Sequence, residues 1–366
     1  MDFRFGYTFP AIRGIQAHRE YFTSMCPLRL IPKIFLFDEA EAELSPELRA
    51  QRMLNRARVP DMRDYIVQNR DDYVFSALTA SIDAVVEFEP LSQEGQESVV
   101  GLLHVPMGAK FIINDGQHRR AAIEEALHER PDLGDESIAV VFFIDRGLER
   151  CQQMFADLNR HGIKPSKSLG VLYDHRDDMA KLVRLVVLRS NFFRDLVEME
   201  RSSVSPRSRK LFTLSALYHA TEELLDGFEF EGEEQAADKA IEFWEAVAEH
   251  MPEWQFVQKR NMSAGEVRKD FIHSHGIALH SLGRMGNALL KKSPKGWKKK
   301  LAKLDDINWA RSNRDLWEGR AMIGGRISKA AQNVVLTTNV LKKQVGLGLG
   351  PDEERAERAL DRNGGS

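Results

Sequence analysis

The chain has 366 residues, of which 43% are hydrophobic and 29% charged, and its formal net charge is −3. This composition is typical of a globular protein that buries a full core, and the length suffices for two domains. The near-balance of charges excludes a protein-wide cationic field, so any contact with nucleic acid has to come from local basic segments.

Cysteines and hydrophobic runs indicate the compartment. The two cysteines, Cys26 and Cys151, form neither a Cys-x-x-Cys motif nor a disulfide framework, which fits a reducing environment. Cys26 is interpreted as a small buried hydrophobe rather than a reactive thiol. The N-terminal residues lack the hydrophobic region of a secretion signal, and no apolar run approaches the about 20 residues of a membrane span. We therefore expect a soluble cytoplasmic protein that contacts no membrane.

The first 170 residues alternate between strand and helix patterns. Predicted strands cover residues 28–37, with an interruption at Pro32, and residues 73–82, 98–106 and 138–144. Predicted helices cover residues 44–57, 62–69 and 148–158. This order predicts a compact domain with a mixed sheet over residues 1–170.

The most informative segment of this domain is residues 110–127. The apolar run 111–113 predicts a buried strand, Asn114, Asp115 and Gly116 break it, and residues 119–127 have helical spacing. A glycine turn that leads into a helix places free backbone N–H groups and the positive end of the helix dipole at one point. With donors from His118, Arg119 and Arg120, the turn is suited to hold a phosphate. The alternative is an ordinary turn with solvated arginines.

Residues 115–119 read Asp-Gly-Gln-His-Arg, which is the signature of DGQHR-domain proteins. Together with residues 73–82, 155–159 and 164–169, this segment resembles the DndB family of regulators of DNA phosphorothioation operons. The resemblance implies a bacterial repressor that binds double-stranded promoter DNA and acts alongside other proteins of the sulfur-modification system. Operator symmetry would favour an even number of copies, such as a homodimer. The chain has no iron–sulfur ligand set and no P-loop, so it is not expected to insert sulfur.

The DGQHR domain also resembles the ParB/sulfiredoxin-like superfamily, in which a glycine turn and a later asparagine box clamp nucleotide phosphates and their metal. The matching positions in this sequence are Gly116, His118 and Arg119 in the first box, and Asn159 with its neighbours Asp157 and Arg160 in the second. The residues predicted to bind the phosphates are Gly116, Gln117, His118, Arg119, Arg120, Asn159 and Arg160. The resemblance implies a nucleoside triphosphate with Mg²⁺ as ligand, although the residues themselves predict no metal site. Asp115 is placed to act as a catalytic base if the nucleotide is hydrolysed.

From residue 171 to residue 345 the composition becomes helical, with predicted helices at 177–199, 212–225, 238–250, 267–290 and 327–345. Two basic segments are interpreted as contacts with DNA phosphates. One is the Ser/Arg loop, residues 200–211, with Arg207, Arg209 and Lys210. The other is the basic run, residues 291–303, which has no acid and includes Lys291, Lys292, Lys295, Lys298, Lys299 and Lys300. Solvated surface is the alternative for both.

Several remaining features receive structural interpretations. His273, His275 and His280 have spacings that do not suit one metal ion, so we expect core or surface histidines. Three glycines are expected at close helix contacts: Gly276, Gly283 and Gly286. The glycine turn in residues 321–329 is not a P-loop, but Arg326 and Lys329 are further phosphate-contact candidates. Residues 346–366 are predicted to be a disordered tail.

These observations predict an α+β protein: a mixed-sheet, ParB/sulfiredoxin-like DGQHR domain followed by a mainly helical domain. Two functions are compatible with it. The first is a DNA-binding repressor of the sulfur-modification operon, and the second is a nucleotide-binding or NTP-hydrolysing protein that uses the glycine turn. Both hold together if a nucleotide binds the DNA-bound and free states with different affinity.

Overall fold

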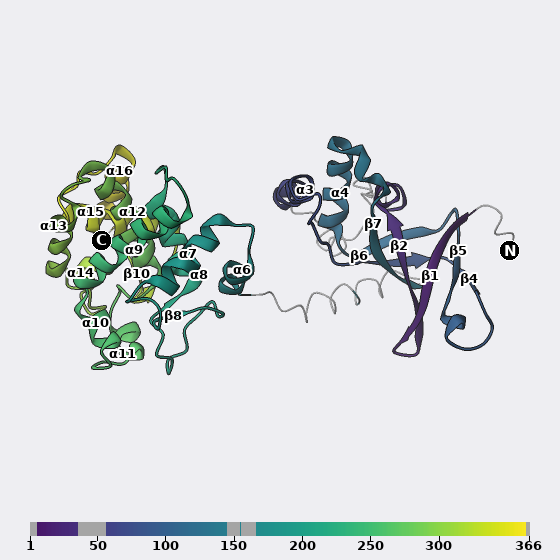
Figure 1. Cartoon of the computed structure of the whole chain (residues 1–366), viewed down its shortest axis with the longest axis horizontal. Helices are drawn as coiled ribbons and strands as arrows, with labels where there is room; N and C mark the ends of the chain where they lie inside the picture. The colour runs from purple at the N-terminus through teal and green to yellow at the C-terminus, as the bar shows by residue number, and fades with distance from the viewer. Residues whose placement is uncertain (1–5, 36–55, 145–153, 155–165, 364–366) are drawn as a thin grey trace. The chain divides into compact units, whose positions relative to one another are not determined.

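The computed structural model describes residues 6–35, 56–144, 154 and 166–363, and its contacts divide the chain into two compact units, residues 1–163 and 164–366 (Figure 1). The first unit is an α+β domain and the second is mainly helical, as predicted. The expected boundary after residue 170 falls inside helix α6, Lys167–Tyr173, which belongs to the second unit. Among the described residues, no helix has the length and hydrophobicity of a membrane span.

The first unit is built on a seven-stranded sheet with the strand order β4-β5-β1-β2-β7-β3-β6. The strands are β1 Gly6–Gln16, β2 Arg19–Pro27, β3 Leu78–Asp83, β4 Glu87–Pro90, β5 Val100–Pro106, β6 Lys110–Asp115 and β7 Ser137–Ile144. Neighbouring strands are antiparallel except for β3 and β7, which are parallel. The predicted mixed sheet is therefore confirmed.

The sequence revealed neither β4 nor the β1–β2 hairpin of this sheet. The turn residues of the hairpin, Ala17 and His18, have φ angles of 51° and 62°. Such turns usually contain glycine or asparagine, which supply positive φ at little cost. Because this turn has neither, the local sequence carries no hairpin signal.

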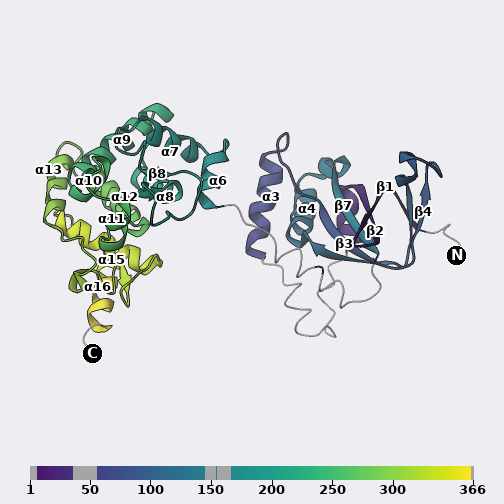
Figure 2. The same cartoon turned by 90° about the horizontal axis from the view of Figure 1, so that it is seen from below.

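Helices α3 (Val59–Gln68) and α4 (Gln117–Glu129) lie on one face of this sheet (Figures 1 and 2), and the short helix α1 (Ile31–Ile34) contacts α4. Their buried side chains join the strands in one hydrophobic core. The predicted strand 28–37 is wrong: residues 28–34 form a 3₁₀ turn and α1. Pro32 lies in the first turn of α1, where a missing N–H breaks no helical hydrogen bond.

One predicted strand of the first unit is shorter in the structure, and two predicted helices fall almost entirely outside the described residues. Of the predicted strand 73–82, the structure forms a strand only from Leu78, and β3 continues to Asp83. The predicted helices 44–57 and 148–158 lie almost entirely outside the described residues.

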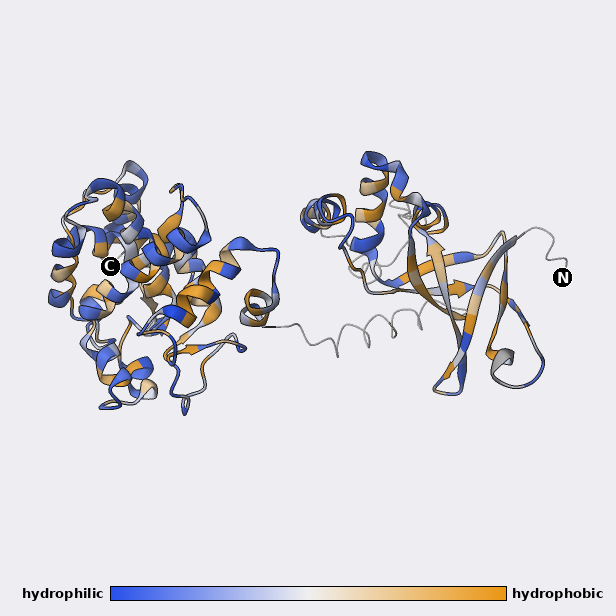
Figure 3. Cartoon of the chain, in the orientation of Figure 1, coloured by the Kyte–Doolittle hydropathy of each residue, from blue (hydrophilic) through white to orange (hydrophobic). Residues whose placement is uncertain are grey.

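The second unit is a bundle of helices around a large hydrophobic core. Its longer helices are α7 Asp178–Arg189, α8 Leu214–Leu225, α9 Glu233–Glu249, α12 Gly276–Lys292, α15 Ala331–Gln344 and α16 Pro351–Asn363. Shorter helices are α6, α10 Pro252–Gln258, α11 Ala264–Asp270, α13 Trp297–Leu301 and α14 Arg314–Trp317. Two small sheets complete the unit: β8 Val197–Glu198 with β9 Phe212–Thr213, and β10 Met322–Ile323 with β11 Arg326–Ile327. Figure 3 shows that most helices carry both hydrophobic and hydrophilic residues.

Glycines of α12 allow its close contact with neighbouring helices. A Cβ atom at Gly283 would clash with the Ala220 carbonyl oxygen, and one at Gly286 would clash with the Phe243 ring. The predicted packing role of these glycines is confirmed. Since glycine in a helix lowers helix propensity by about 1 kcal/mol, close packing is the compensating gain.

The predicted helix 267–290 is instead two helices, α11 and α12, separated at residues 271–275. The break is stabilised by a backbone hydrogen bond of 2.9 Å from the Ile272 N–H to the Trp309 carbonyl oxygen. His273 lies in this break and is fully buried: the Trp254 indole N–H donates to its Nδ1 at 2.9 Å, and Glu253 contacts its Nε2 at 3.0 Å. It is a core histidine, as expected.

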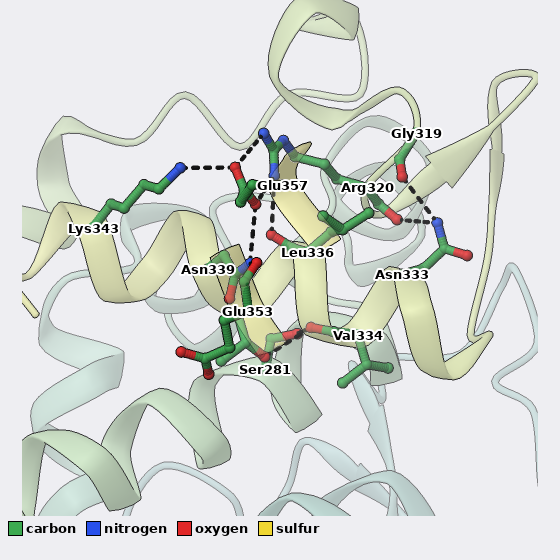
Figure 4. Close-up of polar contacts among 11 residues, drawn as sticks. Ser281, Gly319, Arg320, Asn333, Val334, Leu336, Asn339, Lys343, Glu353 and Glu357 are labelled. Carbon is green, nitrogen blue, oxygen red and sulfur yellow. Dashed lines mark hydrogen bonds and ion pairs between the residues drawn. The ribbon is translucent and has the colours of Figure 1, made fainter. Parts of the chain in front are cut away.

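The region predicted to be a disordered tail, residues 346–366, contains helix α16 (Figure 4). Glu357 of this helix is 8% exposed and pairs with Arg320 at 2.6 Å and with Lys343 at 2.7 Å. The Asn339 amide donates a further hydrogen bond of 3.0 Å to Glu357. The charged, glycine-containing composition of this segment predicted disorder. The helix was missed because the residues that hold it lie elsewhere in the sequence.

Candidate functional site

The DGQHR turn joins β6 to α4, so the predicted strand, glycine turn and helix are confirmed. Gly116 is buried, has φ +111°, and lies so close to Leu78 that a Cβ atom would clash with that side chain. Residues with a side chain rarely adopt this φ. Glycine is therefore required here both by the backbone and by the space.

Arg119 extends from the first turn of α4 back to the segment that precedes β3. Its guanidinium donates to the carbonyl oxygens of Ser76 and Ala77 at 2.7 and 3.0 Å, and to the Asp115 carboxylate at 2.6 Å. The residue is only 9% exposed. Arg119 thus fixes the turn, and Asp115 balances its charge.

Arg120 is also held by the chain itself. Its guanidinium donates to the Phe35 carbonyl oxygen at 2.9 Å and pairs with Glu124 at 2.5 Å, and the residue is 5% exposed. Both arginines that were predicted to bind phosphate therefore have internal partners. Phosphate binding by either of them stays a prediction, and it would compete with these contacts.

Gln117 and His118 are half-buried, and the Asp115 side chain is 47% exposed. No side chain of the described residues caps the N-terminus of α4, so its first backbone N–H groups and the helix dipole act at this point. Burial and the nearby Arg58 lower the pKa of His118, and Asp115 opposes them in part. His118 is therefore mostly neutral at pH 7 and serves as a hydrogen-bonding group rather than as a cation.

The second predicted box lies outside the described residues, and with it Asn159 and Arg160. Met154 is described, and its sulfur lies 3.1 Å from the side-chain amide of Asn114, one residue before Asp115. Residues 114–120 contain one carboxylate, that of Asp115, and Arg119 already pairs with it. Among the described residues, no cluster of His, Cys, Asp and Glu suits a metal. The catalytic role of Asp115 stays a prediction.

A comparison with protein-family models decides the family. The model named DndB, described as DNA-sulfur modification-associated, matches residues 9–348. The chain belongs to the DndB family. The match includes the DGQHR turn and both basic segments. Comparisons with curated proteins and with solved structures found no match. The ParB/sulfiredoxin-like assignment of the first unit stays a prediction.

In this DndB-family protein the Ser/Arg loop is a loop, as predicted, but it connects the short strands β8 and β9, where the sequence predicted helices that end at residue 199 and begin at residue 212. Arg268 of α11 fixes it by donating to the carbonyl oxygens of Ser205 at 2.7 Å and of Lys210. Arg207 and Arg209 are exposed, and within the described residues they form no hydrogen bond or ion pair through their side chains. The loop therefore presents two uncompensated cations from a fixed backbone. Lys210 is half-buried.

The basic run spans the end of α12, a turn and helix α13. Two of its lysines are engaged: Lys291 donates to the Asp226 carbonyl oxygen at 2.7 Å, and Lys298 pairs with Glu242 at 2.8 Å. Lys300 donates to the Ser293 hydroxyl at 2.9 Å. Four exposed lysines of the run form no side-chain hydrogen bond or ion pair in the described part of the chain: Lys292, Lys295, Lys299 and Lys303.

Sequence reasoning missed two features of these basic segments. Arg268 holds the Ser/Arg loop, but its position in a helical pattern does not distinguish it from a solvated arginine. Glu242, which neutralises Lys298, lies in α9 and is not visible from the acid-free run. Trp297 is 4% exposed and packs in the core, so it is not available to stack on a base.

Proposed function

We propose that this protein binds double-stranded promoter DNA and represses the operon for DNA sulfur modification. Membership of the DndB family places it in DNA sulfur modification. The observation that carries the DNA-binding proposal is a set of exposed cations on the second unit, uncompensated within the described residues: Arg207, Arg209, Lys292, Lys295 and Lys299.

Exposed cations of this kind suit the phosphate backbone for a physical reason. Binding releases counterions condensed on DNA, and it costs no existing ion pair when the cation has none. Arg119 and Arg120 of the first unit do not meet this condition, because each would have to leave an internal carboxylate. The proposal therefore assigns the contacts with DNA phosphates to the exposed cations of the second unit rather than to the two arginines of the DGQHR turn. These cations do not specify the base contacts that define the operator.

Fluorescence anisotropy tests the proposal with the protein on the promoter of its own modification operon and on scrambled DNA, at two salt concentrations. We expect a preference for the promoter of about a hundredfold or more that persists at higher salt, since specific binding typically exceeds non-specific binding by about 10³ or more. Arg207→Gln with Arg209→Gln should weaken binding, and Lys298→Gln, which removes a paired lysine, should have the smaller effect. Equal affinities that collapse with salt would contradict the repressor proposal.

The second candidate function is nucleotide binding at the DGQHR turn. It is supported by the N-terminus of α4, which lacks a side-chain cap among the described residues, and by the accessible Gln117 and His118. The contact between Asn114 and Met154 supports it further, because Met154 precedes the second box closely in sequence.

Titration with a fluorescent ATP analogue and Mg²⁺ tests this function. Gln117→Ala with His118→Ala should weaken nucleotide binding at least tenfold, whereas His128→Ala, an exposed histidine near the other end of α4, should not. Arg119→Ala is a poor test, since it would also disturb the turn. Unchanged nucleotide affinity in the double variant would exclude the turn as the nucleotide site.

A further inference from the structure

The second unit contains a cavity of about 770 Å³, and neither DNA binding by the exposed cations nor nucleotide binding at the DGQHR turn requires it. Its walls come from five parts of the chain: the Ser/Arg loop, β9 with the start of α8, α11, the start of α12 with the two residues before it, and Lys329, which follows β11. Its inner surface includes the buried side chains of Leu211, Phe212 and Leu279. This volume is within the range of about 300–1,000 Å³ that is usual for small-molecule sites.

The charged residues of the lining are predominantly cationic. They are Arg268, Lys269 and Lys329 against one carboxylate, Glu266. Glu266 is engaged in a capping box with Ser263 at the start of α11. Lys269 and Lys329 are exposed, and neither side chain forms a hydrogen bond or ion pair within the described residues.

The start of α12 adds to the positive potential of the cavity. This helix has 17 residues, and no side chain among the described residues caps its N-terminus. A Cβ atom on its first residue, Gly276, would lie 3.1 Å from the Lys329 Nζ, so the lysine ammonium lies beside the positive end of the helix dipole. The helix dipole and the ammonium both favour an anion at this point.

His275 and the serines complete the polar lining. The His275 Nε2–H donates to the Arg268 carbonyl oxygen at 2.8 Å, and burial lowers the pKa of His275 to about 4. The imidazole is therefore neutral at pH 7 and leaves the charge of the cavity to the lysines. Ser202 and Ser203 line the cavity from the Ser/Arg loop and are exposed. Hydroxyl groups beside lysines are the donors that commonly contact phosphate oxygens.

We propose that this cavity binds a phosphate group, with Lys269 and Lys329 as its two cationic contacts. The phosphate belongs either to the DNA backbone or to a free phosphate ester. In the first case the inference rests on the proposed DNA-binding function and deepens it, because the Ser/Arg loop forms one wall of the cavity. In the second case it stands independently of DNA binding.

The test uses the full chain and two matched double variants. Lys269→Gln with Lys329→Gln removes the cavity cations, and Lys259→Gln with Arg362→Gln removes two exposed cations that do not line the cavity. Calorimetric titration with inorganic phosphate is the first measurement. Anisotropy on promoter DNA over a range of salt is the second. Unchanged circular dichroism and melting temperature would establish that both variants fold.

We expect the cavity variant to bind phosphate at least tenfold more weakly than the wild type and the control variant. If DNA is the source of the phosphate, the salt slope of DNA binding should also fall by about 0.9, the value for one phosphate that is no longer neutralised. Loss of phosphate binding with unchanged DNA binding would support a free phosphate ester as the ligand.

Binding of DNA and binding of phosphate are measured separately, so either can be lost without the other. A wild-type protein that binds no DNA, but binds phosphate through Lys269 and Lys329, would contradict the repressor and support the phosphate site. Equal phosphate and DNA binding by the cavity variant and the control variant would overturn the inference.

Discussion

Arg119 and Asp115 form an ion pair of 2.6 Å between the first turn of α4 and the end of β6, on either side of Gly116. The Arg119 side chain is 11% exposed and that of Asp115 is 47% exposed. These three residues of the DGQHR signature therefore hold the strand–helix connection together. Gln117 and His118 are half-buried and take no part in this ion pair. The motif combines a structural part and an accessible part.

Replacing Arg119 with lysine should destabilise the first unit, because a single ammonium does not reach Ser76, Ala77 and Asp115 together as the guanidinium does. We expect the free energy of unfolding to fall by about 2–4 kcal/mol. Urea denaturation followed by circular dichroism measures it. Arg130→Lys is the control, since Arg130 pairs with Asp132 on the surface. Equal stability of Arg119→Lys and the wild type would show that the internal contacts contribute little.

Gly116→Ala should also destabilise the protein, for two reasons. The φ angle of +111° is strained for alanine, and the new methyl group would clash with Leu78. A loss of about 1–3 kcal/mol is expected from the backbone alone. Gly108→Ala is a matched control because a Cβ atom there meets no atom within 4 Å. If thermal melting found the two variants equally stable, glycine would not be required at position 116.

The glycine turn could be predicted from sequence because its determinants are local: an apolar run, a glycine and a helical pattern lie within one short segment. The partners of its arginines could not. Arg119 contacts Ser76, 43 residues away, and Arg120 contacts Phe35, 85 residues away. Local sequence identifies a cation, but only the fold determines whether that cation is neutralised. The same reason explains why Lys298 was expected to be free of acids, whereas Glu242 pairs with it.

The secondary-structure errors have related causes. The apolar segment 28–37 has strand composition, but its position over the sheet and a proline suited to a first helical turn make it helical from Ile31. The segment 346–366 has the composition of a solvated tail, yet long-range ion pairs hold α16. Glycines of α12 were correctly assigned to packing. Glycine lowers helix propensity, so several glycines in an apolar helix indicate close contact with a neighbouring helix.

The exposed lysines of the basic run should contribute to DNA binding, and the paired ones should contribute less. We expect Lys292→Gln, Lys295→Gln and Lys299→Gln together to reduce the slope of log affinity against log salt by about 2.7. Lys291→Gln with Lys298→Gln should change it less, because these side chains already bind Asp226 and Glu242. Anisotropy on promoter DNA over a range of salt measures both. A larger effect from the paired lysines would contradict the interpretation.

The ion pairs of Glu357 should make the second unit sensitive to acid. Burial alone would raise the pKa of Glu357, but the hydrogen bonds from Arg320, Lys343 and Asn339 outweigh it and lower the pKa to about 2. The unfolded chain therefore binds this proton more readily than the folded chain. The stabilisation is complete above the ordinary glutamate pKa of about 4.3 and is lost as the pH falls towards 2.

Glu357→Gln should consequently lower the free energy of unfolding by about 3 kcal/mol at pH 7, because Arg320 loses its buried counter-ion. The difference from the wild type should shrink when urea denaturation is repeated at pH 4 and pH 3, since protonation removes the same charge from the wild type. Glu354→Gln is the control: its pair with Arg358 is exposed, and such pairs contribute about 0–1 kcal/mol. A difference that stayed constant from pH 7 to pH 3 would mean that packing of the side chain, rather than its charge, holds α16 in place.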